Sequence, residues 1–199
     1  MDLFEYNRQN QREKFAPLAE KLRPKTLDDV LGQDEITRDG GMIKNAMKTN
    51  NLPSILLYGP PGTGKTTIAE IIAKEMNMNF FKVSAVSSGI KELREVVEKS
   101  AENLRMNMGR SILFVDEIHR FSTSQQDFLL PYVEAGDLVL IGATTENPFF
   151  AVNKALISRL ILIELKSLNP QALEELLDRA NNLYSKENNL TIEISPEAK

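Results

Sequence analysis

Eight consecutive residues combine spaced glycines with a lysine and a hydroxyl side chain, in the order Gly59-Pro60-Pro61-Gly62-Thr63-Gly64-Lys65-Thr66. Glycine lets a backbone turn tightly and bring its N–H groups close to an anion. An apolar run precedes the octet and a helical pattern follows it, so a helix N-terminus would add partial positive charge. The octet therefore predicts a phosphate-binding loop for ATP. Lys65 would reach the β- and γ-phosphates, and Thr66, beside Thr67, would give its hydroxyl to Mg²⁺. The alternative is a chance glycine-rich turn, against which the strand–helix context counts.

Two acids follow another apolar run, in Ile112-Leu113-Phe114-Val115-Asp116-Glu117. Asp116, at the end of a predicted strand, would enter the Mg²⁺ shell beside Thr66. Glu117 would orient and polarise the attacking water. The alternative is a strand that simply ends in solvated acids.

Three later side chains could complete such a site. Thr145, which we favour over Thr144, lies after the fourth apolar run and could hydrogen-bond the γ-phosphate or the water; the alternative is a threonine that caps a turn. Arg159 opens the fifth run and is a candidate arginine finger for a neighbour's nucleotide. Its alternative is a surface arginine, or one paired with an acid such as Glu164. The single histidine, His119, is interpreted as a packing or hydrogen-bonding residue rather than a catalytic one.

The elements that must position these residues are short runs that are apolar throughout, which is typical of strands buried on both faces of a parallel sheet. Five such runs occur, at 54–58, 80–83, 112–115, 138–141 and 160–163. Helical patterns separate them, with one helix expected from about Ser124 to Glu134. Alternating strands and helices predict an α/β fold with a five-stranded parallel sheet flanked by helices. Together with the octet at 59–66, this predicts a P-loop NTPase.

Composition narrows the class of protein further. The chain has no cysteine and one histidine, which excludes disulfides, thiolate catalysis and multi-histidine metal sites. It shows neither an 18-residue apolar run nor a secretory pattern, so we expect a cytoplasmic protein with no membrane partner. Because the net charge is −4 rather than basic, any DNA contact is expected to come from a local patch, from an assembled oligomer, or from sequence outside these 199 residues. Lys91, Arg94 and Lys99 could line a DNA channel, but the acids between them favour a solvated helix face.

The expected organisation has three parts. Residues 1–16 form a polar arm, 17–168 the nucleotide-binding domain, and 169–199 the beginning of a helical lid. Residues 171–187 carry an apolar stripe with a 3.6-residue period, which predicts an amphipathic helix. Ser195-Pro196-Glu197 has the features of a helix start, yet only two residues follow. We therefore expect that the lid is truncated and that the chain is part of a longer protein.

The whole set of motifs resembles the AAA+ ATPases, together with Leu22-Arg23-Pro24 and Asp29-Val30-Leu31-Gly32-Gln33 upstream. In that family the upstream segment contacts adenine, which the resemblance transfers to Val30, Leu31, Gly32 and Gln33. Three blocks are similar to the replication-associated recombination protein A family, whose eukaryotic relatives are the Werner-helicase-interacting and maintenance-of-genome-stability ATPases. These blocks are residues 17–24, 114–121 and 141–148, the last with Thr-Thr-Glu-Asn-Pro.

The resemblance implies an oligomeric, Mg²⁺-dependent ATPase that acts at stalled or damaged replication forks. Its implied partners are DNA, other copies of the chain, and replication proteins such as the sliding clamp or single-strand-binding protein, with a nucleoid-associated location. Asp2-Leu3-Phe4 resembles the end of a clamp-binding peptide but lacks its glutamine, and a plain polar arm is the alternative. The family's lid arginine has no matching segment here, which leaves the hydrolytic activity of the chain on its own open.

Two other functions compete with this one. A nucleotide-gated scaffold or clamp-loader-like subunit would bind ATP without turnover. Such scaffolds commonly lack the water-polarising acid, which is present here as Glu117. A Holliday-junction branch-migration motor shares Asp-Glu-Ile-His-Arg at 116–120, yet it inserts a β-hairpin where only 122–137 separate the third and fourth runs here. Bacterial clamp-loader motors carry zinc-binding cysteines, which this chain lacks.

Overall fold

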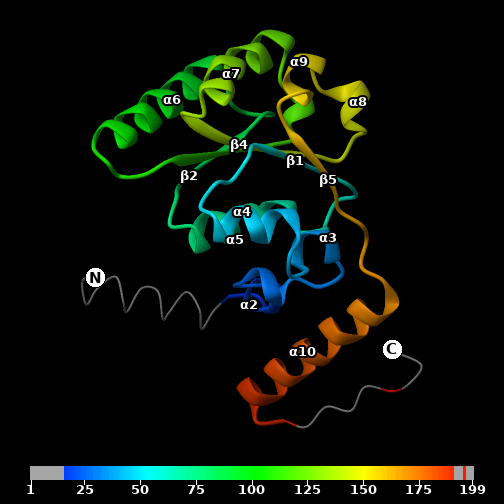
Figure 1. Cartoon of the computed structure of the whole chain (residues 1–199). Coiled ribbons are helices and arrows are strands. Elements are labelled where there is room, and N and C mark those ends of the chain that lie inside the picture. The colour runs from blue at the N-terminus through cyan, green and yellow to red at the C-terminus, as the bar shows by residue number, and fades with distance from the viewer. Residues whose placement is uncertain (1–15, 191–194, 196–199) are drawn as a thin grey trace. The chain divides into compact units, whose positions relative to one another are not determined.

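The computed structural model describes residues 16–190 and 195 (Figure 1). The predicted polar arm, apart from residue 16, and the clamp-like tripeptide lie outside the described residues, as does most of the predicted helix start near Ser195. The chain divides into two compact units, one from Thr26 to Ser167 and one from the described residues up to Lys25 and from Leu168 onward. Each unit is described by itself.

A five-stranded parallel sheet forms the centre of the larger unit, as the sequence predicts. Its strands are β1 (Ile55–Tyr58), β2 (Asn79–Ser84), β3 (Ser111–Asp116), β4 (Leu138–Thr144) and β5 (Ile161–Glu164), in the spatial order β2-β3-β4-β1-β5. The register aligns Tyr58 with Thr144 and with Glu164. The chain order thus reverses beside β1, which leaves the carboxyl ends of β3, β4 and β1 side by side at one edge.

The interior strands are apolar on both faces because helices cover both. Figure 1 shows α5 (Lys65–Glu75) and α4 (Met42–Lys48) on one face, and α6 (Ile90–Arg105), α7 (Thr123–Ala135) and α9 (Lys154–Ile157) on the other. Two separate clusters of buried side chains fill the two interfaces. Phe114 of β3 is fully buried in the first cluster, and its neighbours Leu113 and Val115 lie in the second. This alternation explains why the strand sequences show no polar face.

Capping residues set the helix boundaries. The Ser122 hydroxyl accepts the Gln125 N–H at 3.3 Å and begins α7, while the Asn153 side chain accepts the Ala155 N–H at 2.9 Å and begins α9. Left-handed asparagines at 50, 77 and 107 follow α4, α5 and α6, a conformation that asparagine tolerates better than most residues. The sequence analysis did not predict α4, α9 or α8 (Pro148–Ala151), because helices of four to seven residues carry too little periodicity.

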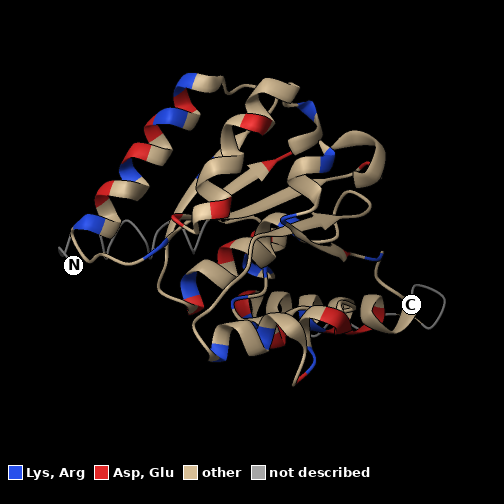
Figure 2. Ribbon diagram, turned by 45° about the horizontal axis from the view of Figure 1, so that its top comes forward, with Lys and Arg blue, Asp and Glu red and all other residues tan. Residues whose placement is uncertain are grey.

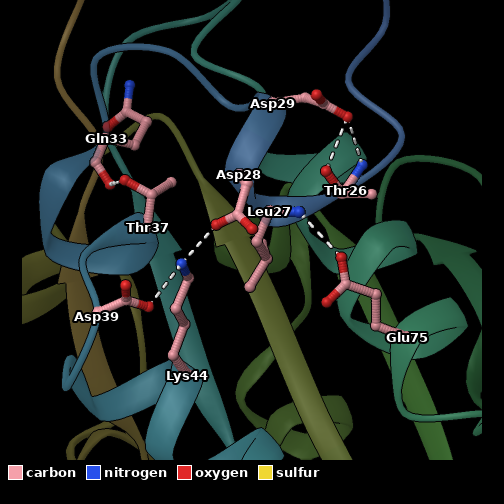
Figure 3. A network of polar contacts seen from close by, with 9 residues as sticks. All are labelled: Thr26, Leu27, Asp28, Asp29, Gln33, Thr37, Asp39, Lys44 and Glu75. Atoms are coloured by element: carbon pink, nitrogen blue, oxygen red, sulfur yellow. Dashed lines mark hydrogen bonds and ion pairs between the residues drawn. The ribbon is translucent and has the colours of Figure 1, made fainter.

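A polar network holds the segment before β1 against the domain (Figure 3). This segment contains η1 (Leu27–Asp29) and α3 (Asp34–Thr37). The Leu27 N–H donates to the Glu75 carboxylate at 3.0 Å, which ties η1 to the end of α5. Lys44 of α4 reaches Asp28 at 2.5 Å and Asp39 at 3.2 Å, and these carboxylates raise its pKa. The network fixes the stretch that precedes Gly32 and Gln33.

The smaller unit contains α2 (Leu18–Lys21) and α10 (Pro170–Asn188), and an ion pair of 2.8 Å joins Lys21 to Glu187. The Asn169 side chain accepts the Ala172 N–H and begins α10, so the predicted amphipathic helix is present with nearly the predicted bounds. Its stripe is only partly covered within the described chain, because Leu173 and Leu177 stay 46% and 40% exposed.

Basic and acidic residues alternate along α6 (Figure 2). The apolar side chains of this helix face the sheet, with Leu93 and Val97 buried. Lys91 and Lys99 therefore lie on a mixed, solvated face rather than on a basic stripe, as the sequence favours. No helix in the described part of the chain is long and apolar enough to cross a membrane.

Candidate nucleotide site

The predicted phosphate loop occupies residues 59–64, between the end of β1 and the first residue of α5. Gly62 and Gly64 have φ values of +78° and +90°, which suit glycine and few other residues. Gly59 has φ +144°, and a Cβ there would lie 2.1 Å from the carbonyl oxygen of Leu165. Only glycine fits at this point, because the loop passes directly against the backbone after β5.

Lys65 points back into the loop from the first turn of α5. Its ammonium group donates to the carbonyl oxygens of Gly59 and Pro60, each at 2.8 Å, and the residue is buried. Burial lowers the pKa of Lys65, while the charges of Glu117 and Asp116 act to raise it. The acid pair therefore lies within electrostatic range of the loop lysine.

Backbone contacts bring the predicted site together at the carboxyl edge of the sheet. Asp116 ends β3, Thr144 ends β4, and Gly59 follows β1. The Gly59 N–H donates to the Thr144 carbonyl at 3.2 Å, so the loop begins as a continuation of the ladder between β1 and β4. Thr63 closes the loop internally, its hydroxyl donating to the Pro60 carbonyl at 3.0 Å. Thr66 and Thr67 follow in the first turn of α5 and are half-buried.

Glu117 holds an unusual backbone conformation. Of the described residues other than glycine, five have positive φ; four are asparagines, and the fifth is Glu117 at +53°. A glutamate gains nothing from the left-handed region, which costs roughly 1–2 kcal/mol for most L-residues. Such strain concentrates at functional sites, where a side chain must be aimed rather than relaxed. The conformation starts η2 (Ile118–Arg120) immediately after β3.

A polar cluster surrounds the Glu117 carboxylate. The Thr145 hydroxyl donates to Glu117 Oε2 at 3.3 Å, and His119 Nδ1 lies 3.2 Å from the same oxygen. His119 Nδ1 is also 2.9 Å from Thr144 Oγ1, and its Nε2 is 3.3 Å from Glu146 Oε1. The exposed Thr145 faces the acid, whereas Thr144 is fully buried and binds the histidine.

The interpretation of His119 as a hydrogen-bonding residue agrees with this geometry, but the sequence analysis missed its partners. The sequence pattern indicates no role for Glu146, and it favours Thr145 over Thr144. The sequence does carry one signal for this cluster, which is spacing. His119 lies two positions after Glu117, and Thr144-Thr145-Glu146 begins at the last residue of β4, the strand that lies next to β3.

Arg159 lies at the amino ends of the strands, opposite the carboxyl ends where the phosphate loop and the acids lie. It follows α9 and precedes β5, whose residue Ile161 aligns with Ile55 at the amino end of β1. Its guanidinium is paired with Glu134 of α7, not with Glu164, and also donates to the Ala155 carbonyl at 2.6 Å. Because the phosphate loop follows the carboxyl end of β1, Arg159 does not join the site of its own chain.

Two of the four upstream residues predicted to contact adenine, Gly32 and Gln33, line a small pocket. A cavity of about 90 Å³ is bordered by Gly32, Gln33 and Ile36, with Asp34, Glu35, Glu164 and Lys166 around it. The Gln33 side chain is committed, because its amide donates to the Lys166 carbonyl at 2.7 Å and accepts the Lys166 N–H at 3.1 Å. Burial raises the pKa of Tyr58 nearby, and the charges of Glu164 and Glu35 raise it further. Val30 and Leu31, half-buried just before Gly32, continue the same segment.

The residues present fit a magnesium ion. Among the described residues, no three His, Cys, Asp or Glu side chains gather into a metal-binding group. Mg²⁺ does not need such a group, because it binds through one or two protein oxygens and completes its shell with waters and substrate phosphates. Asp116 and Thr66 supply hard oxygen donors of that kind, and the loop lysine is near the acids.

A family profile described as "ATPase family associated with various cellular activities (AAA)" matches residues 55–168, more than half of the 199 residues. The chain belongs to the AAA family. The match runs from the first residue of β1 to just beyond β5, so it covers the whole sheet and both acids of the site.

Two relatives show which AAA proteins this chain is similar to. The chain is 47% identical over 166 residues to replication-associated recombination protein A of Haemophilus influenzae, covering 83% of this chain and 37% of that protein. It is 43% identical over 185 residues to ATPase WRNIP1 of Dictyostelium discoideum, covering 93% of this chain and 20% of that protein. The resemblance drawn from the three sequence blocks is thereby confirmed. The AAA chain spans little more than a third of the length of the bacterial relative.

Solved structures agree on the fold. The Thermotoga maritima RuvB Holliday junction branch migration motor matches with a TM-score of 0.70 and 31% identity, covering 82% of this chain and 55% of that one. In the AAA chain described here, η2 and α7 alone occupy the connection between β3 and β4.

Proposed function

We propose that this AAA chain binds and hydrolyses Mg²⁺-ATP. The observation that carries the proposal is geometric: Asp116 ends β3 and Glu117 follows it, at the same carboxyl ends of the strands where the phosphate loop and Lys65 follow β1. The loop N–H groups and Lys65 would hold the phosphates, and Thr66 and Asp116 would hold the metal ion, which supplies charge neutralisation. Glu117 would accept a proton from the attacking water. These are the parts that phosphoryl transfer requires, because it depends on positioning and charge neutralisation.

The acidic pocket suits the base rather than the phosphates. Three acidic residues, Asp34, Glu35 and Glu164, border it together with one basic residue, Lys166, so the net negative charge would repel a triphosphate. A neutral adenine ring carries no such penalty, and Gly32 allows its backbone to be approached closely because glycine has no side chain. Gln33 would act by holding the pocket wall, since both ends of its amide are used on Lys166.

Arg159 would complete the site of a neighbouring copy. It lies at the amino edge of the sheet, away from its own phosphate loop, and 37% of its side chain is exposed. A trans arginine contributes about 10³–10⁵ in rate, or roughly 4–7 kcal/mol of barrier. We therefore propose a homo-oligomer in which Arg159 exchanges Glu134 for a neighbour's phosphate.

The biological setting is a proposal drawn from the relatives. Similarity to replication-associated recombination protein A supports a cytoplasmic, nucleoid-associated ATPase that acts on DNA at stalled or damaged forks, with clamp or single-strand-binding protein as further partners. The predicted division into a nucleotide domain at 17–168 and the beginning of a lid at 169–199 stays part of this proposal. The simple connection between β3 and β4 favours this setting over a branch-migration motor.

Steady-state phosphate release, with and without DNA, tests the proposal in the longest native form of the protein. Lys65→Ala and Arg159→Ala should each abolish turnover, and mixing them should partly restore it because a mixed interface pairs an intact loop with an intact arginine. Restored activity should peak at intermediate ratios. No recovery at any ratio would refute the trans arginine, and no release by the unmodified protein would favour an ATP-binding scaffold.

A further inference from the structure

The imidazole of His119 is enclosed by hydrogen-bonding groups from two elements. Only 8% of the side chain is exposed. On one side Nδ1 faces Glu117 Oε2 at 3.2 Å and Thr144 Oγ1 at 2.9 Å, and on the other Nε2 faces Glu146 Oε1 at 3.3 Å. The ring therefore stands between the acid that would activate water and the turn after β4.

Close packing of η2 on β4 keeps the ring there. Gly142 lies in β4, and a Cβ at this residue would come within 2.7 Å of the Leu56 side chain and 3.2 Å of the Ile118 side chain. The absence of a side chain lets Ile118, next to His119, approach the strand directly. The glycine thus sets the depth at which the histidine meets Thr144.

In a neutral imidazole, the position of the single ring proton decides whether His119 donates a hydrogen bond to Glu117 or to Glu146. A neutral imidazole has one N–H. If the proton is on Nδ1, the ring donates toward Glu117 and Thr144. If it is on Nε2, the ring donates to Glu146, the Thr144 hydroxyl donates to Nδ1, and Glu117 faces a lone pair. Thr144 Oγ1 already accepts the Glu146 N–H at 3.0 Å, so the same hydroxyl links the backbone of the turn to the ring.

Thr145 supplies the other donor to Glu117, but it has one hydroxyl proton. Its present bond to Glu117 Oε2 is 3.3 Å. In the proposed function Thr145 bonds the γ-phosphate, and this hydroxyl cannot donate to both acceptors. When Thr145 turns to phosphate, His119 becomes the donor that remains on the Glu117 carboxylate.

We propose that His119 is a positioning residue that aims the Glu117 carboxylate and ties it to the Thr144–Glu146 turn, taking over when Thr145 engages phosphate. This inference rests on the proposed ATP hydrolysis. His119 touches neither phosphate nor water in this scheme; it acts through Glu117, whose strained backbone alone does not fix the carboxylate.

Three substitutions separate positioning from simple packing. His119→Asn places an amide N–H near the position of Nδ1, His119→Gln places one near Nε2, and His119→Leu has neither donor. We expect the asparagine variant to keep kcat within about five-fold of the unmodified protein. The glutamine and leucine variants should lose roughly 10–100-fold, the effect of removing a hydrogen bond to a charged group. Affinity for a non-hydrolysable ATP analogue should stay unchanged in all three. Equal losses in all three variants would overturn the proposal.

A second measurement does not require turnover. The chain contains a single histidine, so ¹⁵N-histidine labelling gives one pair of ring nitrogen signals. At one fixed pH, Glu117→Gln should shift the Nδ1 signal and Glu146→Gln the Nε2 signal. The control Glu70→Gln, on α5 in an exposed ion pair with Lys82 of β2, should shift neither signal. An Nδ1 signal that does not respond to Glu117→Gln overturns the positioning role, whereas absent phosphate release with responsive signals overturns only the proposed hydrolysis.

Discussion

Replacing Gly59 with alanine should damage the phosphate loop far more than the same change at Gly62. An added Cβ at Gly59 would lie 2.1 Å from the Leu165 oxygen, whereas ordinary contact begins at 3.4 Å, so backbone must move by 3.4 − 2.1 = 1.3 Å. Overpacking of this kind costs about 1–3 kcal/mol. The φ of +144° adds about 1–3 kcal/mol for a residue with a side chain.

Gly62→Ala is the matched control in the same loop. Its φ is also positive, at +78°, but an added Cβ would meet no atom within 4 Å. We expect Gly62→Ala to lower the free energy of unfolding by only about 1–2 kcal/mol, from backbone strain. The free energies of unfolding of the two variants should therefore differ by roughly 1–4 kcal/mol if the clash at Gly59 adds to the strain.

Urea unfolding followed by far-ultraviolet circular dichroism measures this difference, since the chain has no tryptophan for fluorescence. Titration with a fluorescent ATP analogue measures the second consequence, because a displaced Gly59 moves the carbonyl that Lys65 binds. Gly59→Ala should weaken nucleotide affinity more than Gly62→Ala, by about ten-fold if about 1.4 kcal/mol of the cost of displacing the loop is expressed in binding. Equal unfolding energies and equal affinities would refute the close approach of the loop to the backbone after β5.

Three further outcomes follow from single contacts. Gln33→Leu should lower the free energy of unfolding by about 2–4 kcal/mol, because the backbone carbonyl and N–H of Lys166 both lose their hydrogen bonds to the Gln33 amide. Gln33→Glu keeps an acceptor for the Lys166 N–H, so it should lower the free energy of unfolding by less in the same urea titration. Ser122→Ala should cost about 1 kcal/mol by removing the α7 cap, and Ser122→Asp should restore it; unchanged melting of the alanine variant would contradict the capping role. Burial lowers the pKa of Lys65, so as pH rises the folded chain loses the ammonium proton of Lys65 at a lower pH than the unfolded chain does. Between the lowered pKa and 10.5 the unfolded chain therefore binds more protons, and the contribution of Lys65 to the free energy of unfolding rises with pH. Urea titrations across that range should show a steeper rise than in Lys65→Met, and parallel curves would count against the buried lysine.

The sequence was most informative where residues are forced by geometry. Central strands such as β3 must be apolar on both faces, so their runs predict the sheet and, with it, the edge where Asp116 and the phosphate loop meet. The glycines of the loop were equally readable, because positive φ demands them at Gly62 and Gly64.

Contacts between distant segments could not be read in this way. Nothing local to Gly59 indicates the Leu165 carbonyl that excludes a side chain there. The pairing of Arg159 with Glu134, rather than Glu164, depends on how α7 packs beside α9. The environment of His119 required knowing that β4 lies next to β3, and then that the turn at Glu146 folds back over η2. Single-residue chemistry was predictable, whereas partner choice followed from tertiary packing.

The opposite placement of Arg159 and the phosphate loop restricts how copies of the chain can associate. A two-fold dimer presents the same patch on both partners, so it could share arginines only if loop and arginine lay on one surface. The loop follows the carboxyl end of β1, whereas Arg159 precedes the amino end of the parallel strand β5. An assembly that uses Arg159 in a neighbour's site is therefore directional, head to tail. An open row always leaves one loop without an arginine, and only closure into a ring gives every copy an equivalent site.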